Sequence, residues 1–189
     1  MQEIKYLTQD EAGRFFSKIS DRRDRAMFKL MYDFGLRAAE VGKLTLKDVD
    51  LERGRLWITR VKGGVPGEYA FFRDTLRLLK LYLQQRDGDL NPALFVSRNK
   101  NPISRRRIDT LFKRYAKKAK LPADKHHAHT LRHSIAVHML DAGQSQEGVK
   151  DRLGHKSIKS TDIYAKISSH KRDMISREME RAREIVSLN

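Results

Sequence analysis

Apolar residues recur at helical spacing along most of the chain. The repeat is clearest over residues 104–119, where the apolar positions are Ile108, Leu111, Phe112, Tyr115 and Ala119. Positions three and four apart lie on one face of an α-helix, so this segment is predicted to be a helix with one buried face. Further helices are expected from Thr8 onward, after Asp74, and over residues 22–34, 38–44, 130–141, 145–153, 159–165 and 175–186.

Residues that favour helix ends support several of these boundaries. Thr8 and Glu11 have the spacing of a capping box, in which each side chain bonds to the other residue's backbone amide. Gly35 and Gly143 are expected to end the helices before them, because glycine readily adopts the left-handed conformation found there. Thr130 is the candidate N-cap of the helix that reaches Asp141.

β-forming residues gather in one short region. Residues 54–61 (GRLWITRV) and 68–72 (EYAFF) are rich in β-branched and aromatic side chains, and residues 62–67 (KGGVPG) between them are typical of a turn. This pattern predicts an antiparallel hairpin with a glycine-rich tip. The expected fold class is therefore mainly α with a small antiparallel β-sheet, an α+β fold.

The composition limits the class of protein. A length of 189 residues suits one domain with a real core. There is no cysteine, which excludes a disulfide scaffold, a thiol nucleophile and a cysteine-ligated metal. No apolar run approaches the length of a membrane span, and the N-terminus lacks the apolar core of a secretory signal. The expected location is the cytoplasm.

The charge points to a polyanionic partner. Forty Lys and Arg residues against 24 Asp and Glu leave a net charge of +16, and residues 97–125 contain eleven basic and two acidic residues. The helix over residues 104–119 has a strongly basic exposed face, formed by Arg105, Arg106, Arg107, Lys113, Arg114, Lys117 and Lys118. A merely solvated basic face is the alternative, but the total charge favours contact with a phosphate backbone.

Two arginines lie at expected helix starts. His129 and Arg132 are three residues apart and share a helix face, beside backbone amides that attract anions. Together they suit a phosphate, although one His and one Arg in ordinary surface contacts would give the same pattern. Arg37 follows the glycine stop at Gly35, and Glu40 three residues later is a candidate ion-pair partner. This second group would also suit a simple joint between helices.

Three further residues carry possible chemistry. Lys62 lies at the edge of the hairpin turn, where a lysine is usually just solvated. A mobile hairpin tip could nevertheless carry it to the leaving group of a substrate. Tyr164 follows His155 by nine positions in a segment with few core-forming residues. A tyrosine is most often part of a core, and its phenol, with a reference pKa near 10, needs help to act as a nucleophile.

The histidines provide little evidence for a metal site. His129 and His133 are four apart, which would allow both to bind one ion. The intervening residues include Arg132, whose positive charge is unfavourable beside a divalent cation, and the glutamate of an HExxH motif is missing. No metal and no other cofactor is expected.

Taken in order, these residues resemble the catalytic domain of the tyrosine recombinases, the phage integrase family. Three phrases match in kind and order: GLRAAEVGKLTLKDVDL, HTLRHSIAVHMLDAG and LGHKSIKSTDIYAKI. The resemblance extends from about Leu7 to Ile167. Two departures are Ala39, where the family often has serine, and the segment after Lys62, which lacks the usual basic stretch. The second departure bears on the assignment of Lys62 as the lysine of the family pattern.

The resemblance implies a site-specific recombinase that cleaves and rejoins DNA through a 3′-phosphotyrosyl intermediate. Tyr164 would be the nucleophile, and Arg37 and Arg132 would bind the non-bridging phosphate oxygens, a task that suits the planar guanidinium. His155 would donate a further hydrogen bond to the phosphate, and Lys62 would protonate the departing 5′ oxygen. His129 would assist proton transfer at the nucleophile, and Glu40 would support the site from behind.

Two other functions remain open at this point. A type IB topoisomerase uses similar chemistry but rejoins the same strand, and a non-enzymatic DNA-binding module would keep the fold without the chemistry. The resemblance also implies double-stranded DNA as the partner, a homotetramer on that DNA and a monomer in solution. The expected location is the cytoplasm, at the nucleoid. We expect one catalytic domain over residues 1–189 without the separate N-terminal DNA-clamping domain of most members. The last helix, about 170–187, would dock on a neighbouring protomer or on its own domain.

Overall fold

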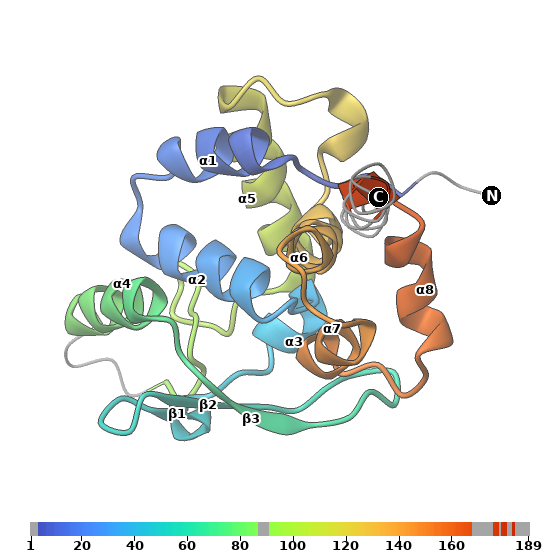
Figure 1. Cartoon of the computed structure of the whole chain (residues 1–189). Helices are drawn as coiled ribbons and strands as arrows, with labels where there is room; N and C mark the ends of the chain where they lie inside the picture. The colour runs from blue at the N-terminus through green and yellow to red at the C-terminus, as the bar shows by residue number, and fades with distance from the viewer. Residues whose placement is uncertain (1–3, 87–90, 168–175, 178, 181–182, 184–189) are drawn as a thin grey trace.

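Helices form most of the protein, as expected, in a computed structural model that describes residues 4–86, 91–167, 176–177, 179–180 and 183 (Figure 1). The α-helices are α1 Gln9–Ser17, α2 Arg22–Asp33, α3 Ala38–Val41, α4 Arg73–Gln84, α5 Arg105–Lys118, α6 His129–Asp141, α7 Gln146–Leu153 and α8 Lys159–Ala165. The strands are β1 Val49–Asp50, β2 Arg55–Ile58 and β3 Gly67–Ala70, and two 3-10 turns cover Leu46–Asp48 and Ala123–Lys125. The predicted fold class is confirmed.

Most of the predicted helix ends are confirmed. Thr8 and Glu11 form the capping box of α1, with the Thr8 hydroxyl accepting from the Glu11 amide and the carboxylate accepting from the Thr8 amide. Gly35 follows α2 with φ +57°, the left-handed conformation that glycine tolerates best. The cap predicted at Thr130 is wrong, because α6 already begins at His129 after Ala128. Thr130 is fully buried, and its hydroxyl donates to the Lys125 carbonyl.

The hairpin is also confirmed, with shorter strands than the sequence suggested. β2 and β3 pair antiparallel with Trp57 opposite Glu68, and β1 adds a third strand that the sequence pattern did not predict. Along β2 the side chains alternate, so that Leu56 and Ile58 are buried whereas Trp57 is exposed. The tip of the hairpin extends beneath α7 and toward α8 (Figure 1).

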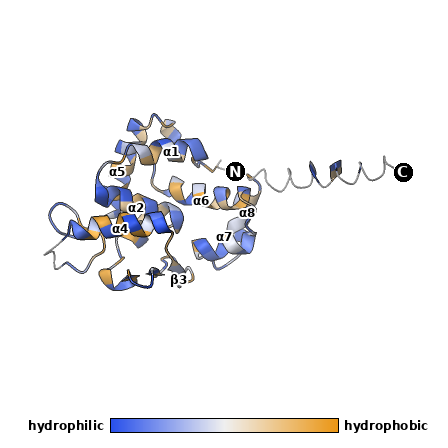
Figure 2. Ribbon diagram, turned by 60° about the vertical axis from the view of Figure 1, so that its left-hand side comes forward, coloured by the Kyte–Doolittle hydropathy of each residue, from blue (hydrophilic) through white to orange (hydrophobic). Residues whose placement is uncertain are grey.

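The core has two parts that meet at α6. The larger cluster includes Phe15, Phe28 and Phe112 from α1, α2 and α5, and the smaller one includes Val149 and Tyr164 from α7 and α8. α6 is in contact with α2, α7 and α8, and it is therefore buried on most of its surface. Figure 2 shows that the other long helices carry hydrophobic and hydrophilic residues together, as helices around a shared core do.

No helix among the described residues is long and apolar enough to cross a membrane. Most of the helix predicted for residues 175–186 lies outside the described residues, including Ile175, Ala182 and Val186 of its apolar stripe. Met179 of that stripe is described and is 61% exposed.

Candidate active site

A cavity of about 700 Å³ gathers the residues that the sequence singled out. Its lining comes from the start of α3, the hairpin tip, α5, the start of α6 and the α7–α8 region. The predicted residues in the lining are Arg37, Lys62, Arg105, Lys113, His129, Arg132, His155 and Tyr164. Five of these are cationic, and Asp109 is the one carboxylate in the same lining. The cavity therefore favours an anion.

Arg132 lies at the back of this cavity and is almost completely buried, with 1% of its surface exposed. Its guanidinium donates to the carbonyl oxygens of Gly35 and Leu153, at the C-terminal ends of α2 and α7. These carbonyls carry the partial negative charge of a helix C-terminus, which stabilises a cation. Burial, followed by the charge of Arg37, lowers the pKa of Arg132 to about 10, so the side chain stays charged at neutral pH.

Arg37 is held by Glu40, as the sequence suggested. Its amide donates to Glu40 Oε2 over 2.9 Å, and its Nη1 donates to Oε1 over 2.9 Å. Glu40 is 1% exposed and also accepts from Nη1 of Arg60 and from the amide of Val61. Burial alone would raise the pKa of Glu40, but these hydrogen bonds and the nearby Arg60 charge lower it overall. The carboxylate is therefore ionised and fixes Arg37 at the cavity wall.

Lys62 reaches the cavity from the hairpin tip. Its backbone is left-handed, with φ +56°, a conformation that costs a non-glycine residue about 1 kcal/mol. The tip is anchored, because the Val65 amide donates to the carbonyl of Gly154 over 3.1 Å. Gly154 directly precedes His155, so the hairpin and the His155 loop are fixed to each other. This places the exposed Lys62 side chain in the same cavity as His155.

His155 is oriented by a buried hydroxyl. Its Nδ1 lies 3.0 Å from Oγ1 of Thr161, and Thr161 is fully buried. If the hydroxyl donates, Nε2 carries the ring proton and can donate to a ligand in the cavity. Burial, followed by the charges of Arg132 and Arg37, lowers the pKa of His155 to about 4. The ring is thus neutral at physiological pH, and it lies nearly parallel to the ring of Tyr164.

Tyr164 has a partner that the sequence analysis considered only as a candidate metal ligand. Its hydroxyl lies 2.9 Å from Nδ1 of His133, and only 2% of the residue is exposed. Burial raises the pKa of the phenol, although Arg132 and Arg37 act in the opposite direction. Burial, followed by the charge of His129, lowers the pKa of His133 to about 3. A neutral His133 accepting from a protonated Tyr164 is the consistent arrangement.

His129 stands beside this pair at the rim of the cavity. Its ring lies edge-on to that of His133, with centroids 4.5 Å apart. Desolvation by the cavity wall and the charges of Arg132 and Arg37 lower the pKa of His129; its side chain is exposed, so water offsets part of the desolvation. The i+4 spacing that raised the question of a metal was the available signal for His133, since it puts both rings on one face.

One expectation about the start of α6 needs correction. The amides of Thr130 and Leu131 already donate to the carbonyls of His127 and Ala128, so they are not free to bind an anion. His127, which no sequence pattern singled out, lines the cavity, and its Nδ1 lies 3.0 Å from the Thr130 hydroxyl.

Within the residues that the structure describes, no three His, Asp or Glu side chains gather as a metal site would require.

The basic face of α5 divides into two sides. Arg105 and Lys113 belong to the cavity lining with Asp109, since residues four apart share a face. Arg114 is turned toward the body of the protein, where Nη2 donates to Asp24 and to the Tyr115 hydroxyl. The remaining basic residues predicted to bind DNA, namely Arg106, Arg107, Lys117 and Lys118, lie on α5 outside the cavity lining.

The fold and this site define a class of protein. The family model described as "Phage integrase family" matches residues 5–171, and the chain belongs to that family. It is 33% identical over 177 residues to tyrosine recombinase XerA from Pyrococcus horikoshii, covering 92% of this chain and 61% of the relative. The expected family and fold are confirmed.

Solved structures show the same fold. The crystal structure of XerA recombinase superposes with a TM-score of 0.83 at 28% identity, covering 94% of this chain and 66% of that chain. XerH site-specific recombinase bound to difH substrate, in a pre-cleavage complex, superposes with a TM-score of 0.74 at 26% identity, covering 85% and 50%. The chain thus spans about three fifths of the length of the XerA relative.

Proposed function

We propose that this protein is a site-specific DNA recombinase, a strand transferase that cleaves and rejoins DNA through a 3′-phosphotyrosyl intermediate. The observation that carries the proposal is the single cavity in which Arg37, Lys62, Arg132, His155 and Tyr164 meet. The names of its relatives support it, because XerA is a tyrosine recombinase and XerH is a site-specific recombinase bound to its substrate.

The two arginines would bind the scissile phosphate. Arg37 and Arg132 present planar, permanently charged groups, which bind two phosphate oxygens better than an ammonium does. His155 adds a donor through Nε2 while Thr161 holds the other ring nitrogen. Because negative charge develops on these oxygens as the phosphorus is attacked, donors already fixed in place stabilise the transition state.

Substrate binding would also activate the nucleophile. The phosphate brings negative charge next to Arg132 and Arg37, which raises the lowered pKa of His133 and of His129 toward neutrality. His133 then receives the phenol proton as the Tyr164 oxygen bonds to phosphorus, and the edge-on His129 assists in that transfer. The bond from phosphorus to the 5′ oxygen breaks, and Lys62 donates the proton that this oxygen needs. Resealing reverses these steps, without metal or nucleotide.

The basic surface of α5 would follow the DNA backbone. Arg105 and Lys113 are next to the cavity, so we propose that they contact the phosphates nearest to the scissile one. Arg106, Arg107, Lys117 and Lys118 would bind phosphates farther along the duplex. Arg114 would contribute less, since its guanidinium is already bonded to Asp24.

Exchange between two duplexes requires an assembly. Two duplexes have four strands to cut, and each copy of this chain supplies one Tyr164. We therefore propose a homotetramer on DNA that forms from monomers in solution, in the cytoplasm at the nucleoid. The helix predicted over about 170–187, most of which lies outside the described residues, would dock on a neighbouring protomer or on its own domain. Sedimentation with and without a duplex substrate tests the assembly.

The nucleophile is tested by trapping the covalent complex. Nicked duplexes with a randomised central region are incubated with the protein, and covalent products are separated on a denaturing gel and sequenced. We expect a protein–DNA band that is absent in Tyr164→Phe and unchanged in Tyr6→Phe, since Tyr6 does not line the cavity. A band that persists in Tyr164→Phe shows that another group attacks the phosphate.

A further inference from the structure

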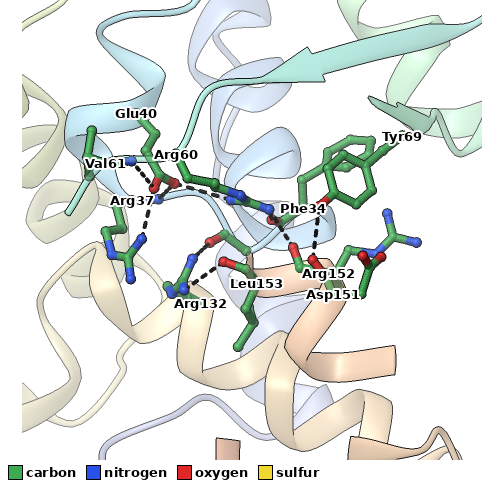
Figure 3. A network of polar contacts seen from close by, with 11 residues as sticks. Phe34, Arg37, Glu40, Arg60, Val61, Tyr69, Arg132, Asp151, Arg152 and Leu153 are labelled. Atoms are coloured by element: carbon green, nitrogen blue, oxygen red, sulfur yellow. Dashed lines mark hydrogen bonds and ion pairs between the residues drawn. The ribbon is translucent and has the colours of Figure 1, made fainter. Parts of the chain in front are cut away.

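Arg60 is a second buried arginine close to the cavity, and it does not belong to its lining. It lies just after β2 and is 6% exposed. Its Nη1 donates to Glu40 Oε2 over 3.2 Å, and its Nη2 donates to the carbonyl oxygens of Phe34 and Arg152 (Figure 3). The Tyr69 ring lies 5.7 Å from the guanidinium carbon.

Arg60 and Arg132 bridge the same two helix ends. Arg132 bonds to the carbonyls of Gly35 and Leu153, which directly follow the carbonyls of Phe34 and Arg152 that Arg60 binds. The two side chains thus connect the C-terminal end of α2 to that of α7 at successive residues. The position of Arg132 depends on the separation of these ends, which Arg60 fixes from the other side.

Arg60 also determines the position of Arg37. The Glu40 carboxylate that it binds is the group that holds Arg37, and the side chains of Arg60 and Glu40 are both fully buried. An ionised carboxylate in such a place is stable only with its charge partners and hydrogen bonds. Without Arg60, Glu40 would lose one of its two arginine partners, and Arg37 would lose a fixed acceptor.

Two glycines pack closely against the Arg60 side chain. A Cβ atom added to Gly154 would stand 2.7 Å from Arg60 Cγ, and one added to Gly64 would stand 2.8 Å from Arg60 Cβ. Both glycines therefore leave room for this side chain at the point where the hairpin tip meets the His155 loop.

We propose that Arg60 is a positioning residue for phosphate binding: it holds Glu40, and through it Arg37, and keeps the ends of α2 and α7 at the distance that Arg132 spans. The proposal rests on the proposed function of the cavity. Arg60 itself touches no substrate. Its loss should weaken the phosphate contacts and leave leaving-group chemistry intact.

Arg60→Met and Arg60→Lys test this role, with Arg86→Met as the matched control. Arg86 is also a buried arginine bonded to backbone carbonyls, those of Asn91, Ala93 and Leu94, and it lies outside the cavity lining. All three variants are compared at a temperature where each is folded by circular dichroism. Inorganic phosphate is titrated while the histidine ring resonances are followed by NMR, and covalent-complex formation is timed on nicked duplexes.

We expect Arg60→Met to weaken phosphate binding about tenfold or more and to slow covalent-complex formation about 100-fold. Arg60→Lys should be intermediate, because an ammonium keeps the charge but cannot span three acceptors. Arg86→Met should match the wild type in both measurements. A duplex with a sulfur in place of the bridging 5′ oxygen, whose leaving group needs no acid, should rescue Lys62→Ala but not Arg60→Met.

Two results would overturn the positioning role. One is an Arg60→Met protein that binds phosphate and forms the covalent complex as fast as Arg86→Met does. The other is rescue of Arg60→Met by the bridging sulfur, which would mean that Arg60 acts through Lys62. Failure of the proposed function has a different signature: the wild type would bind phosphate through its histidines and arginines yet form no covalent complex, and the phosphate titration would still decide the role of Arg60.

Discussion

The phenol oxygen of Tyr164 lies 2.9 Å from Nδ1 of His133, which precedes it by 31 positions. This contact joins α8 to α6, and both residues belong to the cavity lining. The lowered pKa of His133 makes it a weak base while the cavity holds no anion, and the raised pKa of Tyr164 keeps the phenol protonated. In the proposed mechanism the pair therefore transfers no proton until negative charge arrives beside it.

The first prediction concerns His133 as the acceptor of the Tyr164 phenol proton. His133→Asn should slow covalent-complex formation at least about 100-fold, the usual contribution of a general base, with little change in DNA affinity. His126→Asn is the control, because His126 bonds to the Leu121 carbonyl and does not line the cavity. Single-turnover cleavage and a filter-binding assay provide the two measurements. Equal cleavage rates for the two variants would contradict the assignment.

The second prediction is that stability falls as the solution becomes mildly acidic. The pKa values of His133 and His155 are lowered to about 3 and about 4, below the unfolded value near 6.5. Above about pH 7.5 neither state binds these protons, so the two histidines cause no loss of stability there. Between pH 6.5 and 5 the unfolded chain takes up protons that the folded chain excludes, and stability decreases.

Each histidine should contribute a slope of at most about 1.4 kcal/mol per pH unit in that window, where most carboxylates remain ionised. The slope is measured from urea unfolding at several pH values. His133→Asn should lower the slope by the amount that corresponds to about one proton taken up on unfolding. Above about pH 7.5, where the free energy of unfolding does not change with pH, the variant should show the same flat dependence. A slope that is the same in His133→Asn and wild type would mean that His133 titrates alike in both states.

Local sequence signals predicted the fold well, because they depend on neighbouring residues. The capping box at Thr8 and Glu11 and the turn residues 62–67 act over a few positions. The capping box appears where expected, and so does the turn, except that β3 already begins at Gly67. The cap at Thr130 failed for a tertiary reason: the side chain is buried, and its hydroxyl bonds to the Lys125 carbonyl instead of to an amide of α6.

The candidate site was predicted through motifs, together with one supporting residue, Glu40, whereas the supporting roles of His133 and Arg60 were not predicted. Arg37 and Arg132 belong to phrases that resemble a family. His133 lies in the same phrase as Arg132, but its role follows from its contact with Tyr164, 31 positions away. Arg60 becomes significant only through partners far along the chain. Arg60 bonds to the carbonyl of Arg152, 92 positions away, and such a bond leaves no pattern in the sequence. The two sides of the α5 basic face likewise depend on which elements pack against the helix.

The third prediction separates these two sides. Replacing Arg105 and Lys113 together by Gln should weaken DNA binding and reduce the salt slope, log Kd against log salt, by about 0.9 for each phosphate that is no longer neutralised. Arg114→Gln should leave the salt slope nearly unchanged and lower the melting temperature, because it removes the hydrogen bonds to Asp24 and Tyr115. Binding titrations from low to moderate salt give the slopes. Equal salt slopes for the two variants would show that the two sides of the α5 basic face contribute equally to DNA binding.

The last prediction concerns the junction between the hairpin tip and the His155 loop. Gly154 has φ +64°, and an added Cβ would stand 2.7 Å from Arg60 Nε and 2.9 Å from the Val65 carbonyl oxygen. Gly154→Ala should therefore cost at least about 1–2 kcal/mol, since the left-handed strain of a non-glycine residue alone reaches that range. The backbone must also move, which shifts Lys62 and His155 relative to each other.

The matched control is Gly13→Ala, because Gly13 lies within α1 with no atom near an added Cβ. That change should stabilise the protein by up to about 1 kcal/mol, the difference in helix propensity. At a temperature where both variants are folded, Gly154→Ala should form the covalent complex more slowly than wild type and Gly13→Ala should not. Since the two substitutions add the same methyl group, a shared loss of activity would point to a general effect and contradict a role for this junction in the site.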